Sequence, residues 1–79
     1  MDQFTPIARF TVPWGQQEIE LQEVSFDSGG VPLLRVRIRE GRRFTIFDID
    51  AATAHSWGAA MQGWATPQLS ARPAVPGEN

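Results

Sequence analysis

One stretch of the chain limits its possible folds more than any other. Residues 33–49 alternate apolar side chains with arginines up to Arg39, turn at Gly41, and alternate again up to Ile49. Alternation with a period of two residues is typical of half-buried β-strands, and a glycine between two such runs indicates a hairpin. Asp50, a residue type preferred at helix N-caps, comes directly before an alanine-rich segment. The sequence therefore predicts two antiparallel strands followed by a helix.

The turn of this hairpin decides which side chains share a face of the sheet. We expect a three-residue loop that ends at Gly41 in a left-handed conformation. This loop sets Val36 opposite Phe44 and Leu34 opposite Ile46, so apolar side chains meet across the two strands. A two-residue loop is rejected because it would set an arginine opposite Ile46.

Two further strands are expected before the hairpin. Residues 4–12 alternate in the same way, and Pro6 predicts that this strand lies at an edge of the sheet. In residues 17–26 the alternation changes phase near Gln22, which predicts a β-bulge there. Matching of apolar positions predicts the cross-strand pairs Phe10–Ile19, Ala8–Leu21, Leu21–Val36 and Ile19–Ile38.

The helix is expected over residues 51–65, where apolar residues recur at helical spacing. Trp57 and Trp64 lie on this stripe and are interpreted as core residues, and two glycines would let the helix approach the sheet closely. Residues 66–79 are rich in proline and weakly apolar, which predicts a disordered tail. The expected fold is α+β: one domain over residues 1–65, with a four-stranded antiparallel meander and one C-terminal helix packed on one face.

Arginines are the most conspicuous side chains of the hairpin. Arg35 and Arg37 share one face of the first strand, and planar guanidinium groups match phosphate oxygens, which would suit an anion site. The alternative is a solvated sheet face, because the expected register sets Glu20 opposite Arg37 and Glu18 opposite Arg39. We favour the second interpretation, since a row of ion pairs would neutralise most of this charge.

The expected register also leaves apolar side chains without a cover. A helix can cover only one face of the sheet, so apolar residues on the arginine side would form an exposed patch, which usually marks association. The candidate interaction face consists of Leu33, Phe47 and Ile49, rimmed by Arg35, Arg37 and Arg43. Alternatively, twist at the end of the second hairpin strand brings Phe47 or Ile49 under the start of the helix.

No pattern of residues in the sequence supports catalysis or cofactor binding. The chain has no cysteine, and its one histidine, His55, offers with Asp48 and Asp50 neither the number nor the spacing of metal ligands. The serines lie in no nucleophile motif, and no second histidine or lysine is present to act as a base. We therefore expect no enzymatic activity, no metal and no cofactor.

Composition also bears on location and origin. The N-terminal residues show no basic and apolar signal segment, and no run approaches the ~18 apolar residues that span a bilayer. We expect a cytoplasmic protein without membrane contact. All seven basic residues are arginines, and alanine, glycine and proline are abundant, which favours a GC-rich bacterial genome.

The order of these elements resembles a known plan. Four antiparallel strands, ending with residues 36–49 and an Asp50-capped helix, are similar to the PC4-like and Whirly proteins. This resemblance implies a dimer whose sheet holds single-stranded nucleic acid, here through Arg35, Arg37, Arg43 and exposed aromatic side chains. A net charge of −2 favours another hypothesis. We expect a non-catalytic interaction or accessory protein that forms a homodimer, or binds a larger protein, through its open sheet face.

Overall fold

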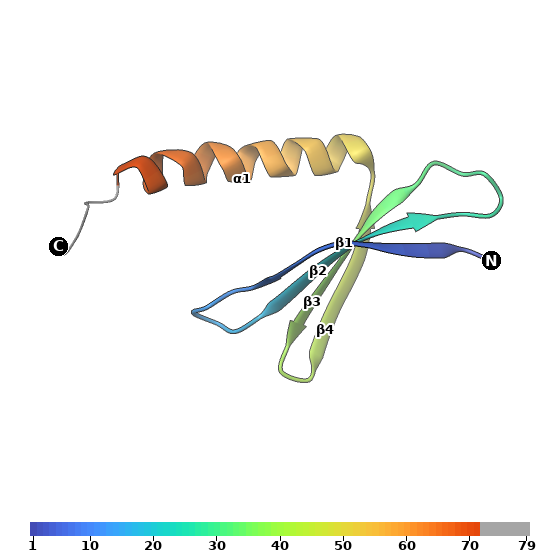
Figure 1. Ribbon diagram of the computed structural model, residues 1–79, viewed down its shortest axis with the longest axis horizontal. Coiled ribbons are helices and arrows are strands. Elements are labelled where there is room, and N and C mark those ends of the chain that lie inside the picture. Colours follow the sequence, from blue (N-terminus) through green and yellow to red (C-terminus); the bar gives the residue numbers. More distant parts are fainter. Residues whose placement is uncertain (72–79) are drawn as a thin grey trace.

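The computed structural model describes residues 1–71 and confirms the expected α+β fold. Within this range the elements are β1 (Gln3–Thr11), β2 (Glu18–Ser25), β3 (Leu33–Glu40), β4 (Arg43–Ile49) and α1 (Ala51–Ala71). The strands form one antiparallel sheet in the order β1-β2-β3-β4, so strands that are neighbours in the sequence are also neighbours in space. Figure 1 shows α1 leaving the end of β4 and running past the strands.

The pairing of the first three strands follows the apolar pattern of the sequence. Phe10 lies opposite Ile19, and the predicted pairs between β2 and β3 are also confirmed. As expected, β1 is an edge strand. The bulge was predicted in the wrong strand: the register shifts in β1 between Pro6 and Ala8, whereas β2 pairs with β3 without interruption. Since proline has no backbone N–H to donate, the ladder is weakest beside Pro6.

The hairpin between β3 and β4 has a two-residue loop, so the predicted three-residue loop is wrong. Glu40 pairs with Arg43, and Gly41 has a φ of 62° at the first position of the turn. A glycine with positive φ at this position is favoured because such turns match the right-handed twist of the flanking strands. The register therefore sets Val36 opposite Phe47 and not opposite Phe44.

This register sorts the side chains of the sheet onto two faces, because residues directly opposite each other share a face and neighbours along a strand alternate. The first, called the apolar face, carries Ala8, Phe10, Ile19, Leu21, Leu34, Val36, Ile38, Phe47 and Ile49. The second, called the arginine face, carries Phe4, Arg9, Glu18, Glu20, Arg35, Arg37, Arg39, Phe44, Ile46 and Asp48. Helix α1 lies on the side of the apolar face, with the ring of Trp57 centred 6.0 Å from that of Phe47.

The start of α1 confirms the predicted N-cap. The Asp50 carboxylate accepts hydrogen bonds from the backbone N–H of Thr53, at 3.4 Å, and from the Thr53 hydroxyl. These bonds lower the pKa of the Asp50 carboxyl. They also satisfy one of the N–H groups that the first helical turn leaves without a partner.

The helix is longer than predicted, because it continues through Pro67 to Ala71. The predicted tail is therefore wrong for residues 66–71, and the remainder, residues 72–79, lies outside the described part of the chain. Pro67 removes one hydrogen bond of the helix. Good helix formers follow it, among them Gln68 and Leu69, so the helical conformation remains favourable beyond the proline.

The described residues form only a small hydrophobic core. Only Val24 and Val36 are buried among their hydrophobic side chains, each 2% exposed, and α1 contains no buried residue. The radius of gyration is 16.3 Å, whereas a compact domain of this length would have about 11–12 Å. The expectation that Trp57 and Trp64 belong to a core is wrong, because α1 diverges from the sheet after its first turns and leaves both side chains exposed (Figure 1).

We predict that the turn at Gly41 is required for the observed register. Gly41→Val should lower the free energy of unfolding by ~1–2 kcal/mol, because a side chain at positive φ is strained, whereas Gly41→Asn should have a smaller effect since asparagine tolerates this conformation. Urea unfolding of the two variants measures the difference. Equal stabilities would contradict the assigned turn.

Candidate interaction site

The six residues of the predicted interaction face do not lie together. Leu33, Arg35 and Arg37 lie on the arginine side of the sheet, whereas Arg43, Phe47 and Ile49 have the parity of the apolar face. The prediction of one common face was wrong because it used the three-residue loop, and the two-residue loop reverses the parity of β4. The alternative, in which Phe47 lies near the start of the helix, agrees with the contact between Phe47 and Trp57. The six residues are therefore divided between the arginine face and the apolar face.

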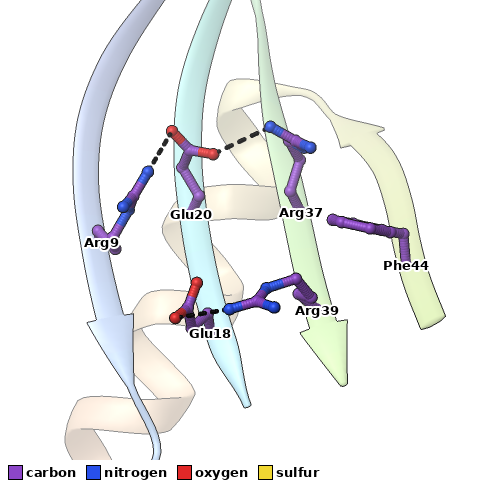
Figure 2. A pocket seen from close by; sticks show the side chains of 6 residues that line it. All are labelled: Arg9, Glu18, Glu20, Arg37, Arg39 and Phe44. Carbon is purple, nitrogen blue, oxygen red and sulfur yellow. Dashed lines mark hydrogen bonds and ion pairs between the residues drawn. The ribbon is translucent and has the colours of Figure 1, made fainter. Parts of the chain in front are cut away.

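The arginine face is a network of ion pairs, as Figure 2 shows. Arg39 lies 2.8 Å from a carboxylate oxygen of Glu18, and Arg37 lies 3.2 Å from Glu20, so both predicted pairs are confirmed. Glu20 also lies 3.6 Å from Arg9 on β1. One carboxylate thus serves two guanidinium groups, which leaves a small excess of positive charge around Glu20.

A further ion pair joins β3 to β4. The Arg35 guanidinium donates two hydrogen bonds to the Asp48 carboxylate, at 2.8 Å and 3.1 Å. The hydrogen bond from Arg35 holds the pKa of the Asp48 carboxyl below its usual value, and the same bond raises the pKa of Arg35. The pair was not predicted, because it depends on the register of the hairpin.

Two phenylalanines lie beneath arginines on this face. The Arg35 guanidinium carbon is 5.1 Å from the ring centre of Phe4, and that of Arg37 is 5.5 Å from the ring centre of Phe44. Such stacking favours a cation over an aromatic ring. Phe44 also borders a shallow pocket of about 220 Å³ between the ion pairs (Figure 2). Phe44 was expected in the core, and only the correct turn would have placed it here.

The apolar face forms one wall of a groove, and α1 forms the other. The groove has a volume of about 250 Å³. Its sheet wall includes Phe10, Ile19, Leu21, Val36 and Ile38, and its helix wall includes Ala54, Trp57, Gly58 and Met61. Because α1 contacts β3 near the start of the helix and then diverges, the groove is open and apolar on both sides.

Helix α1 has an unusual composition for an exposed helix. Its 21 residues, Ala51–Ala71, include no aspartate, glutamate, lysine or arginine. A helix on the surface of a globular protein normally has charged residues on its solvent side. Here Met61, Trp64 and Leu69 are exposed, and Trp64 is 70% exposed. The groove and α1 together form an uncovered apolar surface, and exposed surfaces of this kind usually mark interaction sites.

Residues 1–71 contain neither a cluster of metal ligands nor a membrane-spanning helix. Within residues 1–71, no three histidine, cysteine, aspartate or glutamate side chains lie together so as to hold a metal ion. His55 is exposed on α1. No helix of the described part is long and apolar enough to cross a membrane.

We predict an effect of pH from the ion pair between Arg35 and Asp48. An aspartate whose pKa is lower in the folded chain stabilises the fold above its unfolded pKa of ~3.9, and this contribution is lost as the pH falls through the lower folded value. Asp48→Asn should therefore destabilise the protein at neutral pH and have progressively less effect as the pH falls below the unfolded pKa of ~3.9. Urea unfolding at neutral pH and at acidic pH tests this. An equal effect at both would show that the charge of Asp48 is not responsible.

Comparison with known proteins gives a family but no function. No curated protein and no solved structure has a significant match to the chain. One family model, described as a family of unknown function (DUF6967), matches residues 1–67. The matched range contains all of β1 to β4 and most of α1. The chain therefore belongs to this family of unknown function, DUF6967.

Proposed function

We propose that this protein is a small non-catalytic interaction protein that associates with a second copy of itself through the apolar face and α1. The observation that carries the proposal is an uncharged helix of 21 residues, none of them buried, beside an open apolar groove. Water is a poor environment for such a surface. Full burial of a large apolar side chain contributes ~1.5–3 kcal/mol, so covering a few of them would stabilise the chain substantially.

The small core supports the same proposal. Chains of this length bury only about 60% of their unfolded surface and are marginally stable. With two buried valines among the described hydrophobic side chains, one copy has less core than a typical small domain. A partner that covers the groove would complete the hydrophobic core, so association and folding would support each other.

A second copy is favoured over a larger protein because the two uncovered surfaces complement each other. One is an apolar sheet face and the other an uncharged helix, and sheets and helices normally bury such faces against one another. Each copy carries both surfaces, so a two-fold dimer would cover both at once. The arginine face lies on the opposite side of the sheet, where its ion pairs remain in water.

We predict that Trp64 contributes to self-association. Trp64→Ala should weaken the dimer about thirtyfold or more, because truncation of a central interface tryptophan costs ~2 kcal/mol or more. Phe44→Ala is the matched control: Phe44 is 54% exposed but lies on the arginine face, so its loss should leave the dimer unchanged. Light scattering after size-exclusion chromatography, over a series of concentrations, measures both variants. A similar effect of the two substitutions would contradict the assigned surface.

The arginine face supports a second candidate function, the binding of single-stranded nucleic acid. The specific observation is a half-exposed Phe44 under Arg37, next to the excess of positive charge around Glu20. Arginines with exposed aromatic rings can hold phosphates and stacked bases. The acidic partners of most of these arginines make this the weaker candidate.

This second candidate predicts oligonucleotide binding that decreases steeply with salt and is lost in Arg37→Glu. Fluorescence anisotropy with a labelled single-stranded oligonucleotide at two salt concentrations measures it. Binding that is absent, or that does not respond to salt, would exclude this function.

A further inference from the structure

We propose that the open edge of β4, the side of this strand that faces away from β3, binds an extended segment of another protein as an additional antiparallel strand. The segment carries acidic residues where it passes the turn at Gly41. This surface differs from the groove and from α1, so the proposal goes beyond the proposed self-association and does not depend on it. The backbone sets the class of ligand, because a row of strand N–H and C=O groups pairs with another extended chain.

The two-residue turn decides which backbone groups of β4 point away from the sheet. The residues that flank this turn, Glu40 and Arg43, form a hydrogen-bonded pair. Hydrogen-bonded and non-hydrogen-bonded pairs then alternate along an antiparallel ladder. The N–H and C=O groups of Phe44, Ile46 and Asp48 therefore point away from β3. Within residues 1–71 no strand lies beside them, because β4 is the last strand of the sheet.

The two edges of the sheet differ in how they are protected. On β1, Pro6 has no N–H to donate, and the register shifts between Pro6 and Ala8. Proline and bulges are devices by which edge strands avoid pairing with other chains. β4 has neither, and it pairs with β3 without a shift over Arg43–Ile49. Helix α1 contacts β3 and lines a groove over β1 to β3, so its course leads away from the open edge.

Two apolar side chains lie on the arginine face beside the open edge. Phe44 is 54% exposed and Ile46 is 51% exposed. Directly opposite them on β3 lie Arg39 and Arg37, so β3 offers neither an apolar cross-strand neighbour. An added strand with β-branched side chains at the facing positions provides such neighbours, and pairs of aromatic and β-branched residues stabilise sheets. The side chains therefore suit the same occupant as the backbone.

Charge at the turn end of β4 indicates that the added segment is acidic. Arg42 and Arg43 are exposed, and neither belongs to an ion pair within residues 1–71. The β4 strand of a second copy has no carboxylate to spare, because the one acidic residue of β4, Asp48, already accepts two hydrogen bonds from Arg35. Acidic residues of another protein complement both arginines. This charge complementarity favours a different protein over a second copy.

Fluorescence anisotropy with a designed peptide tests the proposal. The probe is a short fluorescein-labelled peptide that alternates valine and threonine and ends in two glutamates, so that an antiparallel peptide sets its valines opposite Phe44 and Ile46 and its glutamates near the turn. It should bind the full chain. Methylation of the valine backbone nitrogens should weaken binding about tenfold or more, because these nitrogens donate to β4. Methylation of the threonine nitrogens is the matched control and should have little effect, since they point away from β4.

Ile46→Pro is the corresponding change in the protein. The N–H of Ile46 points away from β3, so proline at this position removes a donor from the open edge and none from the existing ladder, as Pro6 does on β1. The peptide should bind this variant about tenfold or more weakly than Ile46→Val, which keeps the N–H. Circular dichroism confirms that both variants fold, and the methylated peptides test the proposal independently of any substitution.

Three results would overturn the proposal: no binding of the unmodified peptide, equal binding of the two methylated peptides, or equal binding by folded Ile46→Pro and Ile46→Val. A lower mass of Ile46→Pro in light scattering would also overturn it, because a second copy would then occupy the edge. A chain that is monomeric but binds the peptide as described would refute self-association and support this proposal.

Discussion

The two-residue turn at Gly41 is the constraint on which the rest of the structure depends. Its positive φ closes the loop so that Glu40 pairs with Arg43, and every later pair of the hairpin follows from that one. A change of parity in β4 would exchange the side chains of its two faces. In the observed register, Phe47 faces α1 and Asp48 reaches Arg35, so both the apolar groove and the charge network result from one turn.

The two faces of the sheet differ in how many of their side chains find a partner within one copy. On the arginine face, opposite charges lie within hydrogen-bond distance of each other on neighbouring strands, and the aromatic rings lie under guanidinium groups. Most charges of that face have a partner on a neighbouring strand, so the face can remain in water. On the apolar face, α1 covers only the part near Phe47. Most charges of the arginine face are paired within one copy, whereas much of the apolar face remains uncovered. This difference is the physical reason for the proposed self-association.

The strand pairing could be predicted from the sequence where the apolar alternation favoured one register. Alternation in β1, β2 and β3 allows a single register with apolar side chains on a common face, and Phe10–Ile19 and Glu20–Arg37 were predicted correctly. In β4 Phe44 and Ile46 lie on one parity and Phe47 and Ile49 on the other, so both parities are apolar. The prediction rejected the two-residue loop because it sets an arginine opposite Ile46, but the structure does pair Arg37 with Ile46. Only the conformation of the turn separates the two parities. The end of α1 was missed because Pro67 is usually a sign that a helix stops.

The candidate site could be predicted only in part for the same reason. The idea of an exposed apolar surface came from the parity of β4, and it pointed to the wrong side of the sheet. The actual groove arises from the divergence of α1 from the strands, which no periodicity in the sequence expresses. One feature of the sequence could have indicated the exposed surface of α1. Ala51–Ala71 contains no aspartate, glutamate, lysine or arginine, whereas a helix that packs on one side only normally carries charges on the other.

Sedimentation equilibrium of the unmodified chain tests the central claim most directly. The claim is that one copy leaves an apolar surface that a second copy covers. A single chain has a mass of 8.8 kDa. The account predicts twice this mass at micromolar concentrations, independent of salt because the contact is apolar. A mass of one chain throughout the same concentration range would contradict it.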